Sequence, residues 1–298
     1  TGVSTAFTKL IQSGTVANSC SAYYLAQIIY TLVSLLPPFF LGSLVIRKIQ
    51  KKKKLVTWGY AEDRVLFGLS IAFGFLALIL ANAATGIMTK FFAEGGVTFD
   101  DPELPMPKTL PEYLLLVIAS VIVPAFVEEF AFRGVVLQSF RKYGDLFAVG
   151  MSSLLFACMH GNMTQMPFAL ILGVVMGILV VATDSIWTGI AIHLFNNTYA
   201  VCLTLISDNC SQMVAYTSTV LINFFGLALG LGACVFASRY YRGARAKKLY
   251  APGGNTKKEQ RKYHAQAWLY SLLSLPMLVA IALLIFNLYV SVHTGGTT

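Results

Sequence analysis

The stretch LLLVIASVIVPAFVEEFAFR, residues 114–133, decides how the chain folds. An apolar segment of about 20 residues is long enough for an α-helix to cross the hydrocarbon core of a bilayer. Near its end the stretch carries Glu128, Glu129 and Arg133. Charged side chains at bilayer depth cost about 3 kcal/mol each on insertion scales, so they are rare unless they are used. The stretch therefore predicts a membrane-spanning helix that holds ionisable groups for a function.

The composition of the whole chain agrees with this interpretation. Of its 298 residues 56% are hydrophobic and 12% are charged, and the mean hydropathy is +0.69, whereas globular domains carry about 25% charged residues. A soluble core of this length cannot hide so much apolar surface, so lipid must surround most of it. We expect an all-α polytopic membrane protein, with residues 1–298 in a single transmembrane domain.

Eight apolar segments are candidate spans, of which the fourth is short. They are Tyr24–Val45, Val65–Met88, Leu114–Arg133, Leu146–His160, Gln165–Thr183, Ile186–Leu205, Met213–Ser238 and Trp268–Val292. Prolines are expected to kink the first span at Pro37-Pro38 and the third at Pro124. Pairs of glycines four residues apart, Gly173 with Gly177 and Gly226 with Gly230, predict close helix packing.

The net charge of +9 does not indicate nucleic-acid binding. The basic residues gather in two runs beside apolar spans, Arg47–Lys54 and Arg239–Lys262. This placement is typical of cytoplasmic loops and of contact with anionic lipid headgroups. The expected partners are therefore the lipid bilayer and a hydrophobic substrate, with no nucleic acid.

Loop charges also predict the orientation of the spans. The first, third and seventh loops are basic or short, and the even-numbered loops are acidic or nearly uncharged. This alternation predicts both termini outside, in an integral protein of a bacterial cytoplasmic membrane, with the glutamates within reach of the cytoplasmic side. Cys20 and Cys210 then lie on the same outer side of the membrane. There they can either form a disulfide or remain two free thiols.

Helical spacing gives the two glutamates different tasks. Glu129 and Arg133 are i,i+4 neighbours with the acid first, which is the favourable order for an ion pair. Glu128 is rotated by about 100° from Glu129 and has no local cation. An unpaired carboxylate in a low-dielectric setting is a candidate general base. A purely structural ion-pair cluster that ties two helices together is the alternative.

Two further spans carry polar residues at a similar depth. His160 ends the fourth span, while His193 and Asn197 share one face of the sixth, with Asn196 as a weaker competitor for Asn197. Imidazole and carboxylate groups can bind zinc or an activated water, so Glu128, His160 and His193 are the candidate zinc ligands. The amide of Asn197 can donate to an oxyanion.

These residues resemble the CPBP family of intramembrane proteases, which includes the CAAX prenyl endopeptidases and the bacterial abortive-infection-like proteins. The family pattern E-E-x-x-x-R, F-x-x-x-H and H-x-x-x-N/D appears in order as Glu128-Glu129 with Arg133, Phe156 with His160, and His193 with Asn197. The resemblance covers about residues 111–200.

The resemblance implies an eight-helix intramembrane endopeptidase. Glu128 would be the base for a water that His160 and His193 hold directly or through a metal. Asn197 would stabilise the oxyanion, and Glu129 with Arg133 would support the site. Some members of the family act as bacteriocin-immunity or regulatory membrane proteins.

The expected activity is hydrolysis of peptide bonds in hydrophobic or membrane-associated peptides. A non-catalytic scaffold or immunity protein on the same fold is one alternative. A transporter or proton relay is another, because acids and histidines at bilayer depth also serve that purpose. The lack of a visible internal repeat argues against a transporter.

Overall fold

A computed structural model describes residues 19–51, 54–56, 58–96, 105–162 and 164–241. Within these ranges the regular elements are all helices, with no strand. The predicted span Trp268–Val292 lies outside the described residues. The other seven predicted spans are all helical, which confirms an all-α polytopic membrane protein.

Six helical stretches are long and apolar enough to cross a membrane, and a seventh is shorter. One of the six is a continuous stretch, Leu110–Tyr143, built from several consecutive elements. In chain order the elements are α3 (Cys20–Ile49), α4 (Arg64–Glu94), α5 (Leu110–Val117), the π-helical η1 (Ile118–Ile122), α6 (Val123–Glu129), the π-helical η2 (Phe130–Val136), α7 (Leu137–Phe140), the 3₁₀ turn η3 (Arg141–Tyr143), the shorter helix α8 (Asp145–His160), α9 (Gln165–Thr183), α10 (Ile186–Asn209) and α11 (Gln212–Tyr240).

Local sequence signals set where several helices begin and end. The Asp63 side chain accepts a hydrogen bond from the Leu66 backbone N–H at 2.9 Å and caps α4, as expected for an N-cap aspartate. Thr109 and Glu112 form a capping box at the start of α5. At the other end of its helix, Gly161 stops α8 in the left-handed conformation, with φ 62°.

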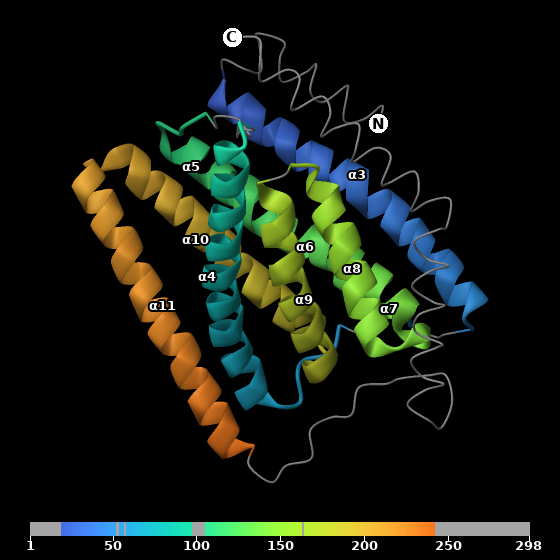
Figure 1. The fold of residues 1–298 in the computed structure, drawn as a ribbon. Helices are drawn as coiled ribbons and strands as arrows, with labels where there is room; N and C mark the ends of the chain where they lie inside the picture. The colour runs from blue at the N-terminus through green and yellow to red at the C-terminus, as the bar shows by residue number, and fades with distance from the viewer. Residues whose placement is uncertain (1–18, 52–53, 57, 97–104, 163, 242–298) are drawn as a thin grey trace.

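The helices run alternately between two faces of the bundle (Figure 1). We call one the basic face: α3, α7, α9 and α11 end there, and α4, α8 and α10 begin there. The described Lys and Arg residues near this face are Arg47, Lys48, Lys51, Lys54, Arg64, Arg141, Lys142 and Arg239. The opposite face has only Lys90 and Lys108 in the described ranges. The basic loops therefore gather at one face of the bundle, and the side of the membrane that this face meets stays a prediction.

The helix that carries the glutamates departs from regular α-helical geometry on both sides of them. The π-helical segment Ile118–Ile122 precedes Pro124, and a second π-helical segment, Phe130–Val136, follows Glu129. Proline lacks the N–H that an α-helical turn uses, so a wider turn next to it accommodates the loss. Such π-helical turns are frequent at functional sites.

Glycines allow close contact between the helices, as their spacing predicted. A Cβ at Gly173 or Gly177 would lie 3.3 Å from Ser153 Cβ or 3.0 Å from a Val149 methyl group, so both glycines of α9 face α8. On α11, Gly226 and Gly230 face Phe75, Ala72 and Leu76 of α4 in the same way. Both pairs are therefore packing positions.

The cysteines Cys20 and Cys210 are free thiols in this structure. Both lie near the opposite face, at the start of α3 and just after the end of α10. The Cys20 thiol contacts the backbone carbonyl of Pro105 at 3.5 Å.

Candidate active site

Glu129 lies at the centre of the candidate site. Its side chain is fully buried, with 0% exposed, and Arg133 is 1% exposed. The Arg133 Nη1 atom donates to Glu129 Oε1 at 2.8 Å, so the i,i+4 pair expected from the sequence is present. A buried charge of this kind is tolerated only with a partner.

Arg133 is fixed by two further helices. Its guanidinium carbon lies 4.3 Å from the centre of the Phe156 ring of α8, a cation–π arrangement. Its Nη2 atom approaches the Gly173 carbonyl of α9 at 3.5 Å. Arg133 therefore connects the glutamate helix to α8 and α9.

Space for the Glu129 carboxylate depends on a glycine in α10. A Cβ at Gly189 would collide with Glu129 Oε2. Sequence reasoning missed this residue. The signal that points to it is a lone glycine one helical turn before His193.

His193 connects both glutamates. Its Nδ1 lies 3.0 Å from Glu129 Oε1. Because the Glu129 carboxylate can only accept, Nδ1 carries a proton, and in the neutral imidazole the Nε2 atom then holds the lone pair. That Nε2 atom lies 3.9 Å from Glu128 Oε2.

Glu128 has a more open environment than Glu129. Its side chain is 14% exposed, against 0% for Glu129. The 3.9 Å separation from His193 Nε2 is too long for a direct hydrogen bond and leaves room for a bridging water. The two glutamates thus differ in their partners: Glu129 is held by Arg133 and His193, and Glu128 faces the second nitrogen of the same imidazole.

His160 has the same tautomer as His193. Its Nδ1 lies 2.9 Å from the Phe156 carbonyl, which can only accept, so Nε2 is again the free nitrogen. The Phe156 ring lies 4.8 Å from the His160 ring and 6.0 Å from the His193 ring, between centroids. Phe156, noted in the sequence only as a motif residue, therefore packs against Arg133, His160 and His193.

Asn197 lies one turn beyond His193 in α10, in the wall of a cavity of about 150 Å³. The cavity is lined by Tyr24, Met106, Leu116, Ser120, Asn197, Ala200, Val201 and Thr204. The Asn197 Oδ1 atom accepts from Asn196 Nδ2 at 2.9 Å, which leaves the Asn197 Nδ2 group as a donor. Asn196 therefore orients Asn197.

The predicted zinc ligands do not form a coordination site in this structure. A zinc site takes three or more protein ligands, and no group of three or more His, Cys, Asp and Glu side chains in the described part of the chain is arranged to hold an ion. The set Glu128, His160 and His193 is not gathered for coordination here. Its role as a metal site stays a prediction.

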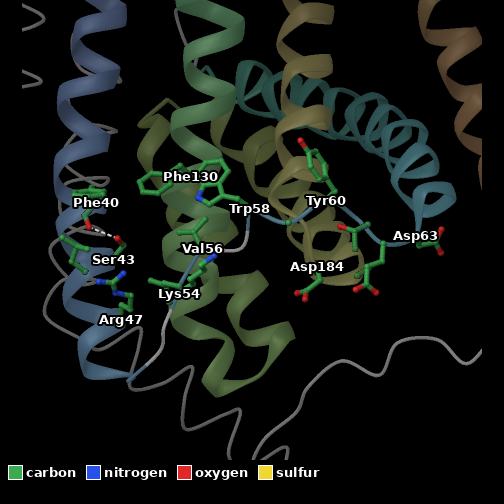
Figure 2. A pocket seen from close by; sticks show the side chains of 16 residues that line it. Phe40, Ser43, Arg47, Lys54, Val56, Trp58, Tyr60, Asp63, Phe130 and Asp184 are labelled. Atoms are coloured by element: carbon green, nitrogen blue, oxygen red, sulfur yellow. Dashed lines mark hydrogen bonds between the residues drawn. The ribbon is translucent and has the colours of Figure 1, made fainter.

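A larger cavity, of about 1030 Å³, lies at the basic face. Figure 2 shows Arg47 and Lys54 on the side of this cavity next to α3, and Asp184 on the side away from α3. An adjoining apolar groove of about 590 Å³ shares Phe40, Trp58 and Phe130 with it. None of the six predicted site residues lines either space.

Comparisons with known proteins agree with the motifs. Residues 110–199 match the family described as type II CAAX prenyl endopeptidase Rce1-like. The "Putative membrane peptidase YdiL" of Bacillus subtilis (strain 168) is 23% identical over 183 residues, which are 60% of this chain and 73% of that protein. No solved structure gives a significant match. Together the two matches agree with the predicted resemblance to the CPBP family, and the apolar helices agree with an integral membrane protein.

Proposed function

We propose that this protein is an intramembrane endopeptidase in which Glu128 activates a water molecule. The observation that carries the proposal is the unequal environment of the two glutamates around His193. Glu129 is held by Arg133, whereas Glu128 faces the His193 Nε2 atom at 3.9 Å, a separation that a water can bridge. The substrate class is a hydrophobic or membrane-associated peptide.

The proposed step needs only residues of this chain. A water between Glu128 Oε2 and His193 Nε2 gives its proton to Glu128, and its oxygen attacks the carbonyl carbon of the scissile bond. The Asn197 Nδ2 group donates to the oxyanion that forms. When the C–N bond breaks, the proton held by Glu128 moves to the leaving amine, which restores the carboxylate.

Three other residues support this chemistry. Glu129 fixes the tautomer and orientation of His193, in the way that a buried carboxylate orients a catalytic imidazole. Arg133 balances the charge of Glu129. His160, with its free Nε2, is the second group that can hold the water or the oxyanion.

Two other functions are less well supported. An immunity or scaffold protein on this fold has no need for an imidazole nitrogen facing a second, more exposed carboxylate. A proton relay needs a titratable path between the two faces, and the cavity at the basic face is not lined by the site residues. Cleavage of a peptide that depends on Glu128 separates hydrolysis from both.

The test is cleavage by the purified protein in proteoliposomes, with a library of hydrophobic and prenylated peptides read by mass spectrometry. Glu128→Gln is expected to lower kcat by about 10²–10⁴-fold, the usual contribution of a general base, with little change in KM. Full activity in Glu128→Gln would refute the proposal.

Glu62→Gln is the matched control. Glu62 lies outside the site, in the wall of the cavity at the basic face, so the same substitution there is expected to leave kcat unchanged. Equal unfolding temperatures of both variants and the wild type show that the fold is intact.

Zinc content measured on the wild type and on His160→Ala tests the predicted metal ligands separately.

A further inference from the structure

We propose that the cavity at the basic face and the apolar groove that adjoins it form a binding site for one anionic phospholipid. The phosphate group contacts Arg47 and Lys54, and one acyl chain lies in the groove between α3 and the helix that carries Glu128 and Glu129. This site goes beyond the proposed hydrolysis and does not depend on it.

The two spaces together have the amphipathic form of a phospholipid. The cavity of about 1030 Å³ contains the basic side chains, and the groove of about 590 Å³ shares Phe40, Trp58 and Phe130 with it. The residues that line the groove are all aliphatic or aromatic: Leu36, Pro37, Phe40, Trp58, Phe126, Val127 and Phe130. A polar headgroup therefore fits the cavity, and a hydrocarbon chain fits the groove.

One face of α3 shows the same change from apolar to basic. Pro37, Phe40, Leu44 and Arg47 follow one another at spacings of three or four residues, so they share a face of the helix. Each of them lines the groove, the cavity or both. The basic residue is the last of the four, near the end of α3 at the basic face.

The length of this face matches the depth of one leaflet. Leu36 and Arg47 are 11 positions apart, which is about 16 Å along an α-helix. Half of a hydrocarbon core of about 30 Å is about 15 Å. A headgroup held at Arg47 therefore lets its acyl chain extend along the groove to Leu36.

The positive charge on the α3 side of the cavity has no internal partner. Arg47 and Lys54 are both exposed. Neither forms an ion pair with a carboxylate in the part of the chain that the structure describes. Basic residues next to a span attract anionic headgroups, so these two side chains are available to a lipid phosphate.

The carboxylates of the same cavity lie elsewhere. Figure 2 shows Asp63 and Asp184 on the side away from α3. Asp184 pairs with Arg141 at 3.1 Å, and Asp63 accepts a hydrogen bond from the Tyr241 hydroxyl. The third carboxylate, Glu62, is exposed. The unbalanced positive charge is therefore on the side of the cavity that the groove joins.

Trp58 lies where the headgroup and the acyl chain meet. Its ring stacks on Phe130, with centroids 6.2 Å apart and an interplanar angle of 12°. Its backbone carbonyl accepts from the Trp187 indole N–H at 3.2 Å, and Tyr60 stacks on Trp187 in turn. Trp and Tyr side chains favour the headgroup level of a bilayer. This wall of the site is thus formed by contacts within the protein itself.

The inner wall of the groove belongs to the helix of the two glutamates. Phe126 and Val127 directly precede Glu128, and Phe130 directly follows Glu129. A lipid that binds between this helix and α3 binds the folded protein only. By mass action such a ligand raises the unfolding temperature, so binding can be measured through stability as well as through stoichiometry.

Lipid titration of the purified, delipidated full chain in detergent tests the assignment. Dioleoyl phosphatidylglycerol or dioleoyl phosphatidylcholine is added, and bound lipids are counted by native mass spectrometry. One phosphatidylglycerol is expected to bind about 30-fold more tightly than phosphatidylcholine, the ratio expected for two basic residues on the phosphate group, and to raise the unfolding temperature. Equal binding of the two lipids would overturn the proposal.

Arg47→Gln combined with Lys54→Gln is expected to abolish the preference for phosphatidylglycerol. Lys48→Gln combined with Lys51→Gln is the matched control, because it removes the same charge from the same stretch of chain and neither residue lines the cavity. The control is expected to keep the preference. Equal losses in the two double variants would mean that the basic stretch attracts lipid without a defined site.

A tryptophan pair tests the groove. Leu36→Trp places a larger side chain in the groove, whereas Leu41→Trp lies on the exposed surface of α3, outside both spaces. Only Leu36→Trp is expected to weaken the binding of phosphatidylglycerol. Unchanged binding in Leu36→Trp would show that the acyl chain lies elsewhere and would overturn the proposal.

Two additions distinguish the lipid from other occupants. Sodium phosphate at the same concentration is expected to leave the unfolding temperature unchanged, and an equal rise would assign the cavity to a free anion. Displacement of phosphatidylglycerol by a peptide that the protein cleaves would assign the groove to the substrate. Full activity of Glu128→Gln would refute the hydrolytic mechanism and leave the lipid site standing.

Discussion

Glu129 and Arg133 form a buried pair whose two charges depend on each other. Both side chains are buried, and their 2.8 Å contact links two residues one turn apart in the same continuous helix. Ion pairs of this kind add little stability compared with apolar packing, but the loss of one partner leaves a buried charge uncompensated. The pair is therefore better explained by the orientation that Glu129 gives to His193.

The first prediction concerns Arg133→Met. We expect it to lower the free energy of unfolding by about 3–5 kcal/mol, because the Glu129 carboxylate is left buried without a cation. Glu129→Gln combined with Arg133→Met is expected to recover most of that loss, since the amide is neutral and still accepts from His193. Thermal unfolding in detergent, followed by intrinsic fluorescence, measures both; a double variant as unstable as the single one would contradict this account.

At the residue scale the sequence predicted what lies within one helix and missed what lies between helices. The i,i+4 spacing of Glu129 and Arg133 was sufficient to expect their ion pair. The contact of His193 Nδ1 with Glu129 depends on how α10 crosses the glutamate helix. Spacing within one helix carries no information on that crossing. The same holds for Gly189, whose importance comes from the carboxylate of another helix.

Helix α11 packs on α4 through glycines. A Cβ at Gly230 would lie 2.6 Å from Leu76 Cβ and 3.3 Å from the Ala72 carbonyl oxygen. By contrast, a Cβ at Gly232, half a turn further along α11, meets nothing within 4 Å. Both glycines lie in the same helix, so their comparison isolates the packing contribution.

The second prediction uses this pair. Gly230→Ala is expected to destabilise the protein by about 1–3 kcal/mol, the usual cost of overpacking. Gly232→Ala is expected to be neutral or to stabilise by up to about 1 kcal/mol, because alanine is the better helix former. Unfolding temperatures of the two variants test it; equal losses would show that the α4–α11 contact is not close.

At the element scale apolar length predicted the helices well. The seven predicted spans within the described residues are helical, because the lack of water in the bilayer core forces backbone groups to pair within one segment. The π-helical segments around the glutamates were not predicted. Only Pro124 hinted at irregular geometry there, and a proline does not specify how the neighbouring turns adapt.

In the molecule as a whole, Asp63 and Tyr241 join the start of α4 to the end of α11. The Tyr241 hydroxyl donates to the Asp63 carboxylate, across 178 positions of sequence. The hydrogen bonds from Tyr241 and from the Leu66 backbone lower the pKa of Asp63. Burial and the neighbouring carboxylate raise the pKa of Tyr241 to about 12.

The third prediction follows from the signs of these shifts. A lowered pKa at Asp63 means that its contribution is present above the ordinary aspartate pKa of about 3.9 and is lost as the pH falls through the folded-state value. The raised pKa of Tyr241 means that its contribution is present below about pH 10 and is lost as the pH rises towards 12. Tyr241→Phe is therefore expected to lower the unfolding temperature at pH 7 and to have a progressively smaller effect as the pH falls below the ordinary aspartate pKa. A difference that persists at the acid end would contradict the assignment.

The length of α8 has a consequence for the membrane around the enzyme. Its 16 residues extend about 24 Å, against a hydrocarbon thickness of about 30 Å. A hydrophobic mismatch of this size is met by local thinning of the bilayer, at a cost of fractions of a kcal/mol per Å. Lipid headgroups and water are thereby drawn towards His160, and the bilayer itself becomes part of the solvation of the site. Peptide cleavage should be faster in dimyristoyl than in dierucoyl phosphatidylcholine vesicles at equal protein content, and a rate that is indifferent to acyl-chain length would show that the lipid does not deform there.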